Sequence, residues 1–149
     1  MSKKIYFDMD GTLADFYGVN GWLYFLEKED TYPYKNARPL FNFRNFAKIL
    51  HKLQDNGYEL GVISWGSKTS SEEFLEKTKK EKIKWLKKHL PSVSFSEILI
   101  IPYGVEKSSV CECPEGILFD DEEKNRIEWS KNGFAFSEKN IPLVLKSLI

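Results

Sequence analysis

Residues 3–16, KKIYFDMDGTLADF, decide the fold because they join an apolar run directly to a group of acidic side chains. Residues 5–7 are a short apolar run of the kind that becomes a buried strand. Two carboxylates, Asp8 and Asp10, follow at once. A carboxylate at the end of a core strand is costly to desolvate unless a cation or a reaction uses it. The segment therefore predicts a buried strand with a functional site at its end.

Similar apolar runs recur along the chain and alternate with longer charged segments of helical periodicity. The runs are rich in branched or aromatic residues, which is typical of strands buried on both faces of a parallel sheet. We expect an α/β fold, a doubly wound (Rossmann-like) parallel five-stranded sheet with helices on both faces. The expected strands cover residues 5–7, 60–63, 98–101, 117–119 and 134–136, and the expected helices cover about residues 43–54, 70–90, 122–131 and 142–148.

Two segments between the strands have features of their own. In the second expected helix, Ser70 and Glu73 fit a capping box, and the many lysines are most simply a solvated face. About residues 15–40 break the alternation because they are aromatic, turn-rich and inserted directly after the first strand. We interpret this insertion as a small cap on a single domain that spans residues 1–149.

The composition limits the partners. Lys plus Arg and Asp plus Glu both number 22, so no global field attracts nucleic acid, and we do not expect it as a partner. No run approaches the ~20 apolar residues of a membrane span, so we expect a cytoplasmic protein without a membrane partner. Cys111 and Cys113 have one residue between them, and we expect free thiols of a reducing compartment.

Polar side chains follow four of the expected strands. The carboxyl ends of parallel strands share one edge of the sheet, and ligands gather there. Carboxylates, hydroxyls and an amine arriving at that edge from four places in the sequence predict a site for an anionic ligand and a cation. They are Asp8, Asp10 and Thr12 after the first strand, Ser64 after the second, Lys107 beyond the third, and Asp120 and Asp121 after the fourth.

In their order and spacing, these motifs resemble the pattern of the haloacid dehalogenase-like phosphohydrolases. The matching segments are DMDGT, ISW, Lys107 and ILFDD, and they span essentially the whole chain. The resemblance implies a Mg²⁺-dependent phosphatase that acts on a small-molecule phosphate ester. In this reading Asp8 attacks phosphorus to form an aspartyl-phosphate, and Asp10 protonates the leaving group and then deprotonates water.

The remaining residues receive supporting roles in the same reading. The implied metal ligands are Asp8, the backbone carbonyl of Asp10 and Asp120, with Asp121 supporting them from behind or replacing Asp120 as the direct ligand. The implied phosphate-binding groups are Ser64, the backbone amide of Trp65, Thr12 and Lys107, which also neutralises charge on Asp8.

Within that family the chain looks most like the deoxyribonucleotidase-type 5′-nucleotidases. The shared features are the insertion after the first motif, RPL, KWLKKHL and the final Asp doublet. The chain departs from that branch in its shortened insertion and in SWGSK, where the branch carries Thr-Ser-Pro. A nucleoside monophosphate is therefore the first expected substrate. The alternatives are a sugar or other small-metabolite phosphate, a polynucleotide end phosphate, against which the zero net charge weighs, and a non-catalytic regulator on the same fold.

Overall fold

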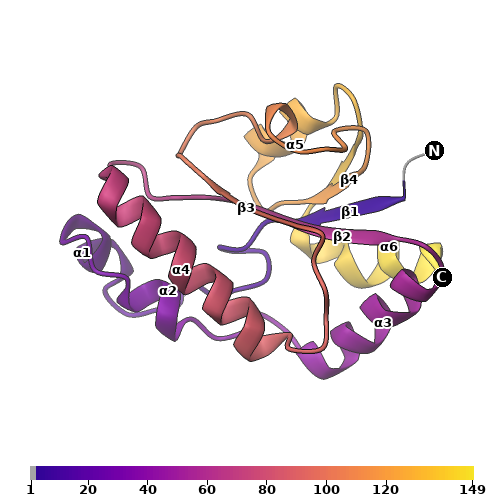
Figure 1. Cartoon of the computed structure of the whole chain (residues 1–149), viewed down its shortest axis with the longest axis horizontal. Helices are drawn as coiled ribbons and strands as arrows, with labels where there is room; N and C mark the ends of the chain where they lie inside the picture. Colours follow the sequence, from indigo (N-terminus) through magenta and orange to yellow (C-terminus); the bar gives the residue numbers. More distant parts are fainter. Residues whose placement is uncertain (1–2) are drawn as a thin grey trace.

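Five parallel strands form the centre of the structure, a computed structural model that describes residues 3–149 (Figure 1). The predicted α/β fold with a doubly wound sheet is confirmed. The strand order is β3-β2-β1-β4-β5, which places β1 in the middle of the sheet. The strands are β1 (Lys4–Phe7), β2 (Glu59–Trp65), β3 (Glu97–Ile101), β4 (Ile117–Phe119) and β5 (Phe134–Phe136).

Helices cover both faces of this sheet. Ile5 and Phe7 of β1 belong to the larger core, which lies between the sheet and the helices below it in Figure 1. Tyr6 points to the opposite face and packs edge-on against Trp129, with ring centroids 5.5 Å apart. Alternate residues of one strand thus serve two cores, as expected of a strand buried on both sides. The helices are α3 (Phe43–Asp55), α4 (Glu72–His89) and α6 (Ile141–Leu148) on the first face and α5 (Glu123–Trp129) on the second.

The helix α3 shows how local sequence sets these elements. The Asn42 side chain accepts hydrogen bonds from two backbone N–H groups of the first turn, which otherwise have no partner. Phe46, Leu50 and Leu53 are buried at helical spacing and face the sheet. Gly57, at φ 92°, follows the last turn in a left-handed conformation that glycine adopts without strain.

The start of α4 differs from the sequence prediction. The capping residue is Ser71, whose Oγ accepts a hydrogen bond from the Phe74 N–H at 3.1 Å. The prediction of Ser70 with Glu73 was therefore wrong by one residue. The physical reason is tertiary, because the backbone N–H and Oγ of Ser71 both donate to the Glu29 carboxylate, at 2.8 and 2.9 Å.

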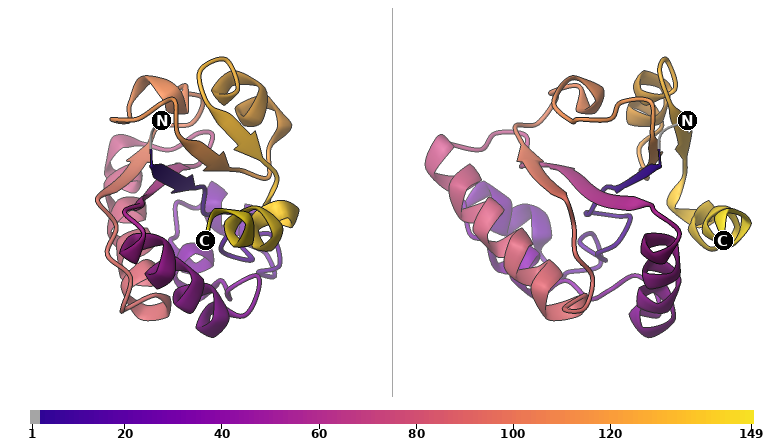
Figure 2. Two further views of the ribbon diagram at one scale, coloured as in Figure 1. Left: turned by 90° about the vertical axis from the view of Figure 1, so that its right-hand side faces the viewer. Right: turned by 45° about the vertical axis from the view of Figure 1, so that its right-hand side comes forward.

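The insertion at residues 15–40 contains two short helices that the sequence analysis did not assign. They are α1 (Trp22–Glu27) and α2 (Tyr32–Asn36), and Figure 2 shows both beside α4. Phe16, Tyr34 and Phe74 form a small core that joins the insertion to α4. Tyr24 is 60 % exposed, so the aromatic residues divide into some that pack the insertion and some that remain accessible.

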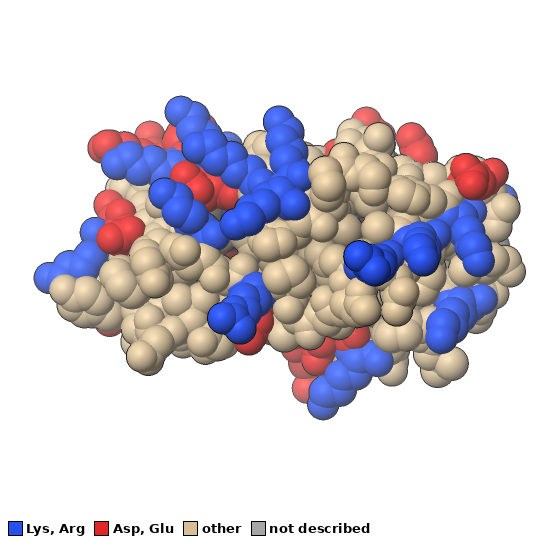
Figure 3. Space-filling view, turned by 90° about the horizontal axis from the view of Figure 1, so that it is seen from below, with Lys and Arg blue, Asp and Glu red and all other residues tan. Residues whose placement is uncertain are grey.

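The charged surface is mixed in sign. Figure 3 shows Lys and Arg side chains in several groups on one face, with Asp and Glu side chains among them. Within residues 3–149, no helix combines the length and the apolar character needed to span a membrane. Cys111 and Cys113, which the sequence analysis expects to be thiols, are both partly buried, and the Cys113 Sγ lies 3.2 Å from Glu115 Oε1.

Candidate active site

The strand order creates a crevice between β1 and β4. From β1 the chain passes to β2 and β3, which lie on one side of β1 within the sheet. It then returns and places β4 on the other side of β1. Ligands of open α/β sheets bind at such a switch point, outside the carboxyl ends of the strands. Asp8 follows β1 and Asp120 follows β4, and the Asp8 N–H donates to the Phe119 carbonyl at 2.9 Å. Backbone pairing therefore brings the two aspartates together.

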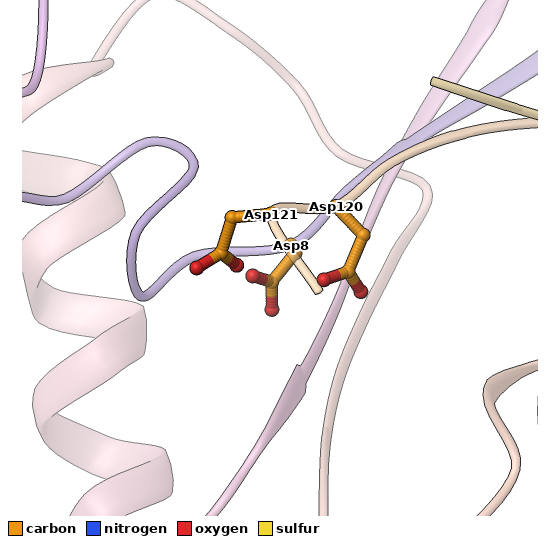
Figure 4. Close-up of side chains that lie close together, drawn as sticks. All are labelled: Asp8, Asp120 and Asp121. Carbon is orange, nitrogen blue, oxygen red and sulfur yellow. The ribbon is translucent and has the colours of Figure 1, made fainter. Parts of the chain in front are cut away.

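Three carboxylates meet at this point. Asp8, Asp120 and Asp121 each offer an oxygen atom, and these oxygens all lie within 4.8 Å of one another. Figure 4 shows Asp8 between the other two, with the three carboxylates extending to the same side of the chain. Asp8 and Asp120 are buried and Asp121 is partly buried. The side chain of Asp121, which was predicted to support the ligands from behind, thus lies within the cluster itself.

Lys107 bridges two members of this cluster. Its Nζ donates to Asp8 Oδ1 at 2.9 Å and to Asp120 Oδ2 at 2.7 Å, and the side chain is buried. Burial alone would lower the pKa of Lys107, but the charges of the two aspartates and their hydrogen bonds raise it above its usual value. Lys107 is therefore a fixed positive charge beside Asp8, where the sequence predicted it.

Asp120 is held from several directions. Besides Lys107, the Asn125 Nδ2 donates to its Oδ2 at 3.1 Å, and the Glu122 N–H donates to its Oδ1 at 3.0 Å. The sequence analysis missed Asn125. Its only signal was its position in the first turn of the helix that follows the Asp doublet. These contacts fix the orientation of the Asp120 carboxylate before any ligand binds.

Thr12 and Gly11 shape the loop after β1. The Thr12 hydroxyl lies 3.1 Å from Asp8 Oδ2 and accepts a hydrogen bond from the Asp121 N–H at 3.2 Å. Thr12 is fully buried and ties the two acidic loops together, while its predicted contact with a phosphate stays a prediction. Gly11 has φ +82°, and a Cβ there would lie 2.2 Å from Asp121 Oδ2. Both its conformation and its close approach to Asp121 require glycine.

Lys82 is a site residue that the sequence analysis missed. It was counted among the solvated lysines of α4, yet it is buried and its Nζ lies 2.9 Å from Asp10 Oδ2. The available signal was its register, because it continues the buried stripe that begins at Phe74 and Thr78 with a spacing of four. A lysine on that stripe has to find a partner inside the protein.

Asp10 lies beside the cluster but pairs differently. Burial raises the pKa of its carboxyl, an effect that the nearby Lys82 charge opposes and the Asp8 charge adds to. The resulting direction is upward, so Asp10 holds a proton more readily than an ordinary aspartate. A carboxyl group with a raised pKa keeps a larger protonated fraction for donation and is a stronger base when it accepts a proton. The role of the Asp10 backbone carbonyl as a metal ligand stays a prediction.

Two adjoining cavities open at this edge. The smaller has a volume of about 60 Å³, and the aspartates, Lys107, Ser64 and Trp65 line it. The larger has a volume of about 280 Å³ and extends under the insertion, close to the lower end of the ~300–1,000 Å³ range of small-molecule sites. Tyr17, Tyr103 and Glu122 line both. The site therefore offers a polar end for a small anion and a wider aromatic end for the group attached to it.

The charges of the polar end fit a divalent cation. Four aspartates gather here, Asp8 and Asp10 after β1 and Asp120 and Asp121 after β4, against the ammonium groups of Lys82 and Lys107. Burial and the charge of Asp8 raise the pKa values of Asp120 and Asp121. Protons or a cation must therefore compensate the cluster. Clustered carboxylate oxygens are the ligands that Mg²⁺ prefers.

No protein-family model matches the chain, and no curated protein matches it.

Proposed function

We propose that the protein is a Mg²⁺-dependent phosphatase that hydrolyses phosphate monoesters through an aspartyl-phosphate on Asp8. One observation carries the proposal. The Asp8 carboxylate lies in a buried acidic cluster, is fixed by Lys107, and lines a small cavity together with Asp10 and Ser64. A nucleophile, a proton carrier and positive charge at one small cavity are the parts that phosphoryl transfer needs.

In the first step, an oxygen of Asp8 forms a bond to phosphorus as the bond from phosphorus to the ester oxygen breaks. Asp10 gives its proton to that departing oxygen, so the alcohol leaves as a neutral molecule. Ser64 supports this step as a donor, because its Oγ accepts a hydrogen bond from Lys82 and its own hydrogen is left for a phosphoryl oxygen. Lys107 balances the negative charge that builds up beside Asp8.

In the second step, Asp10 takes a proton from a water molecule, and the water oxygen attacks phosphorus. The bond between Asp8 and phosphorus breaks, inorganic phosphate is released, and Asp8 and the protonated Asp10 are restored. Splitting the hydrolysis in two lets the same carboxyl group serve as acid and then as base.

The residues that would hold the Mg²⁺ ion are Asp8, Asp120 and Asp121, with the Asp10 backbone carbonyl as a further predicted ligand. When bound, Mg²⁺ supplies charge neutralisation for the aspartates and for the phosphoryl oxygens.

We further propose a nucleoside monophosphate as the substrate. Support comes from the larger cavity, which adjoins Asp10 and carries Phe16, Tyr17, Trp22 and Tyr103. Aromatic faces stack on any nucleobase. The cavity is wide enough for a leaving group of small-molecule size, and a sugar phosphate, the alternative, would leave most of this aromatic surface without a matching partner.

The chemistry is tested with an aryl phosphate and Mg²⁺. We expect turnover that exhaustive EDTA treatment abolishes and Mg²⁺ restores. Asp8→Asn, nearly isosteric but not nucleophilic, should abolish turnover, whereas the control Asp55→Asn, at an exposed position, should not change it. Activity that survives EDTA would contradict the metal assignment, and an active Asp8→Asn variant would contradict the covalent mechanism.

The substrate class is tested with a panel of nucleoside monophosphates and sugar phosphates under the same conditions. We expect the highest kcat/KM for a nucleoside monophosphate. A preference for sugar phosphates would replace the substrate assignment and leave the mechanism intact. A folded wild-type protein inactive on aryl phosphate and on every ester would instead favour a non-catalytic role.

A further inference from the structure

Lys82 lies on the buried face of α4, where its ammonium group needs polar partners inside the protein. Its Nζ donates to three oxygens, Asp10 Oδ2 at 2.9 Å, Ser64 Oγ at 2.6 Å and the Trp65 carbonyl at 2.9 Å. A lysine ammonium has three hydrogens, so these three acceptors use all of them. The ammonium also lies 4.8 Å from the centre of the Tyr34 ring in the insertion.

These contacts leave Lys82 no opportunity to bind substrate itself. The residue is 1 % exposed, and it is absent from the residues that line either of the two cavities. Asp10, in contrast, lines both cavities, and about 20 % of its side chain is exposed. Lys82 therefore stands behind Asp10 as seen from the cavity.

The anchoring groups of Lys82 are rigid. Ser64 and Trp65 are the last two residues of β2, and both are hydrogen-bonded into the central sheet. Tyr34 stacks on Phe16 with ring centroids 5.0 Å apart. The ammonium is thus fixed by the end of a strand and by the insertion, and its remaining hydrogen holds a single oxygen of Asp10. With Oδ2 held by Lys82, Oδ1 is the oxygen left to exchange a proton.

We infer that Lys82 is a positioning residue that fixes the Asp10 carboxyl group, so that Oδ1 carries the proton to and from the reacting oxygen. This role rests on the proposed phosphatase function and extends it to a residue outside the motifs of the sequence. The reason for a lysine here is geometric, since a proton carrier displaced by a fraction of an ångström loses much of its effect. The hydrogen bond from the Lys82 ammonium to Oδ2 opposes the rotation that would exchange the two oxygens.

The test compares an aryl and an alkyl phosphate in wild type and Lys82→Met. An aryl alcohol leaves readily without a proton, whereas an alkyl alcohol needs one, so poor positioning of Asp10 harms the alkyl ester more. We expect kcat/KM to fall about 10- to 100-fold on the alkyl ester, as for the loss of a charge-assisted hydrogen bond, and at least fivefold less on the aryl ester. The control Lys87→Met changes an exposed lysine of the same helix and should leave both rates unchanged.

A double-mutant cycle separates positioning from general damage. If Lys82 acts through Asp10, Lys82→Met should cost much less in an Asp10→Asn background, because the group that it positions can no longer transfer a proton. Should Lys82→Met fail to fold, as judged by circular dichroism and thermal unfolding, Lys82→Gln takes its place in both measurements.

The outcomes are distinct. Equal losses on both esters, fully additive losses in the cycle, or rates within threefold of wild type would each overturn the inference while leaving the phosphatase proposal standing. A wild-type protein that hydrolyses neither ester would overturn the phosphatase proposal, and the role of Lys82 would fall with it.

Discussion

Replacing Lys107 with methionine is the sharpest single perturbation of this site. Methionine keeps much of the side-chain volume but removes both ion pairs, those to Asp8 at 2.9 Å and Asp120 at 2.7 Å. Two buried carboxylates then lose their cation. Breaking a buried pair by removing one partner costs about 3–5 kcal/mol of stability. If Lys107 also stabilises charge in the transition state, the barrier rises by about 2–4 kcal/mol, which corresponds to roughly a 30- to 1,000-fold loss of kcat.

Two assays read these losses separately. Urea unfolding in EDTA measures the free energy of unfolding, and aryl-phosphate hydrolysis with Mg²⁺ measures the rate. We expect the stability loss to be smaller in Mg²⁺, because the cation then balances the same carboxylates. Since the raised pKa of Lys107 keeps it charged, its stabilisation persists through neutral pH and is lost only when the pH rises through that pKa.

The matched control is Lys124→Met, which removes an exposed lysine from α5 and should change neither quantity appreciably. A Lys107→Met protein as stable in EDTA as wild type, with a rate within threefold, would refute the reasoning that Lys107 neutralises the cluster.

Three further predictions concern the cation and the insertion. Burial and the charge of Asp8 raise the pKa of Asp121, so the folded protein without metal retains a proton that Mg²⁺ must displace. The rise in Tm at a fixed Mg²⁺ concentration should therefore grow from pH 6 to pH 8. A rise in Tm that stays constant over this range would contradict the prediction. Gly11→Ala should weaken the Mg²⁺-induced rise in Tm because the new Cβ meets the Asp121 carboxylate. The control Gly104→Ala has a similar φ of +88° and nothing within 4 Å of the new Cβ, so it should leave the rise intact. Equal effects of the two variants on the rise would exclude the contact with Asp121 as the cause. Trp22→Ala should lower kcat/KM for a nucleotide by up to about a hundredfold and change kcat/KM for aryl phosphate little. Tyr24 lines neither cavity, so the control Tyr24→Ala should change neither value. Matching losses on both esters in Trp22→Ala would mean that Trp22 only supports the fold.

Much of the fold could be predicted because strands buried on both faces leave a local signal. The five apolar runs became the five strands, and β2 extends one residue before and two residues beyond the predicted run. The acidic motifs directly follow β1 and β4, so their place at the carboxyl edge follows from the parallel arrangement. For the same reason the sequence predicted that Lys107 and the aspartates share one edge of the sheet. The hydrogen bonds of Lys107 to Asp8 and Asp120 confirm this.

Other features depended on which elements meet in space. The sequence analysis did not predict the order of the strands in the sheet. Asp8 and Asp120 are neighbours because that order places β4 beside β1. The insertion showed no helical period long enough to predict α1 and α2. Such short helices gain their stability from tertiary packing, here of α2 against α4 and of α1 against α2. The cap at Ser71 was selected over Ser70 by Glu29, a residue from the insertion.

Lys82 shows the division most clearly. The sequence determined that α4 is a lysine-rich helix, and its stripe from Phe74 through Thr78 fixed which face would be buried. Only the tertiary structure decided that Asp10, Ser64 and the Trp65 carbonyl stand opposite that face. A buried ammonium is tolerated only where all of its hydrogens find acceptors, and those acceptors come from β2 and from the loop after β1, far from Lys82 in the chain.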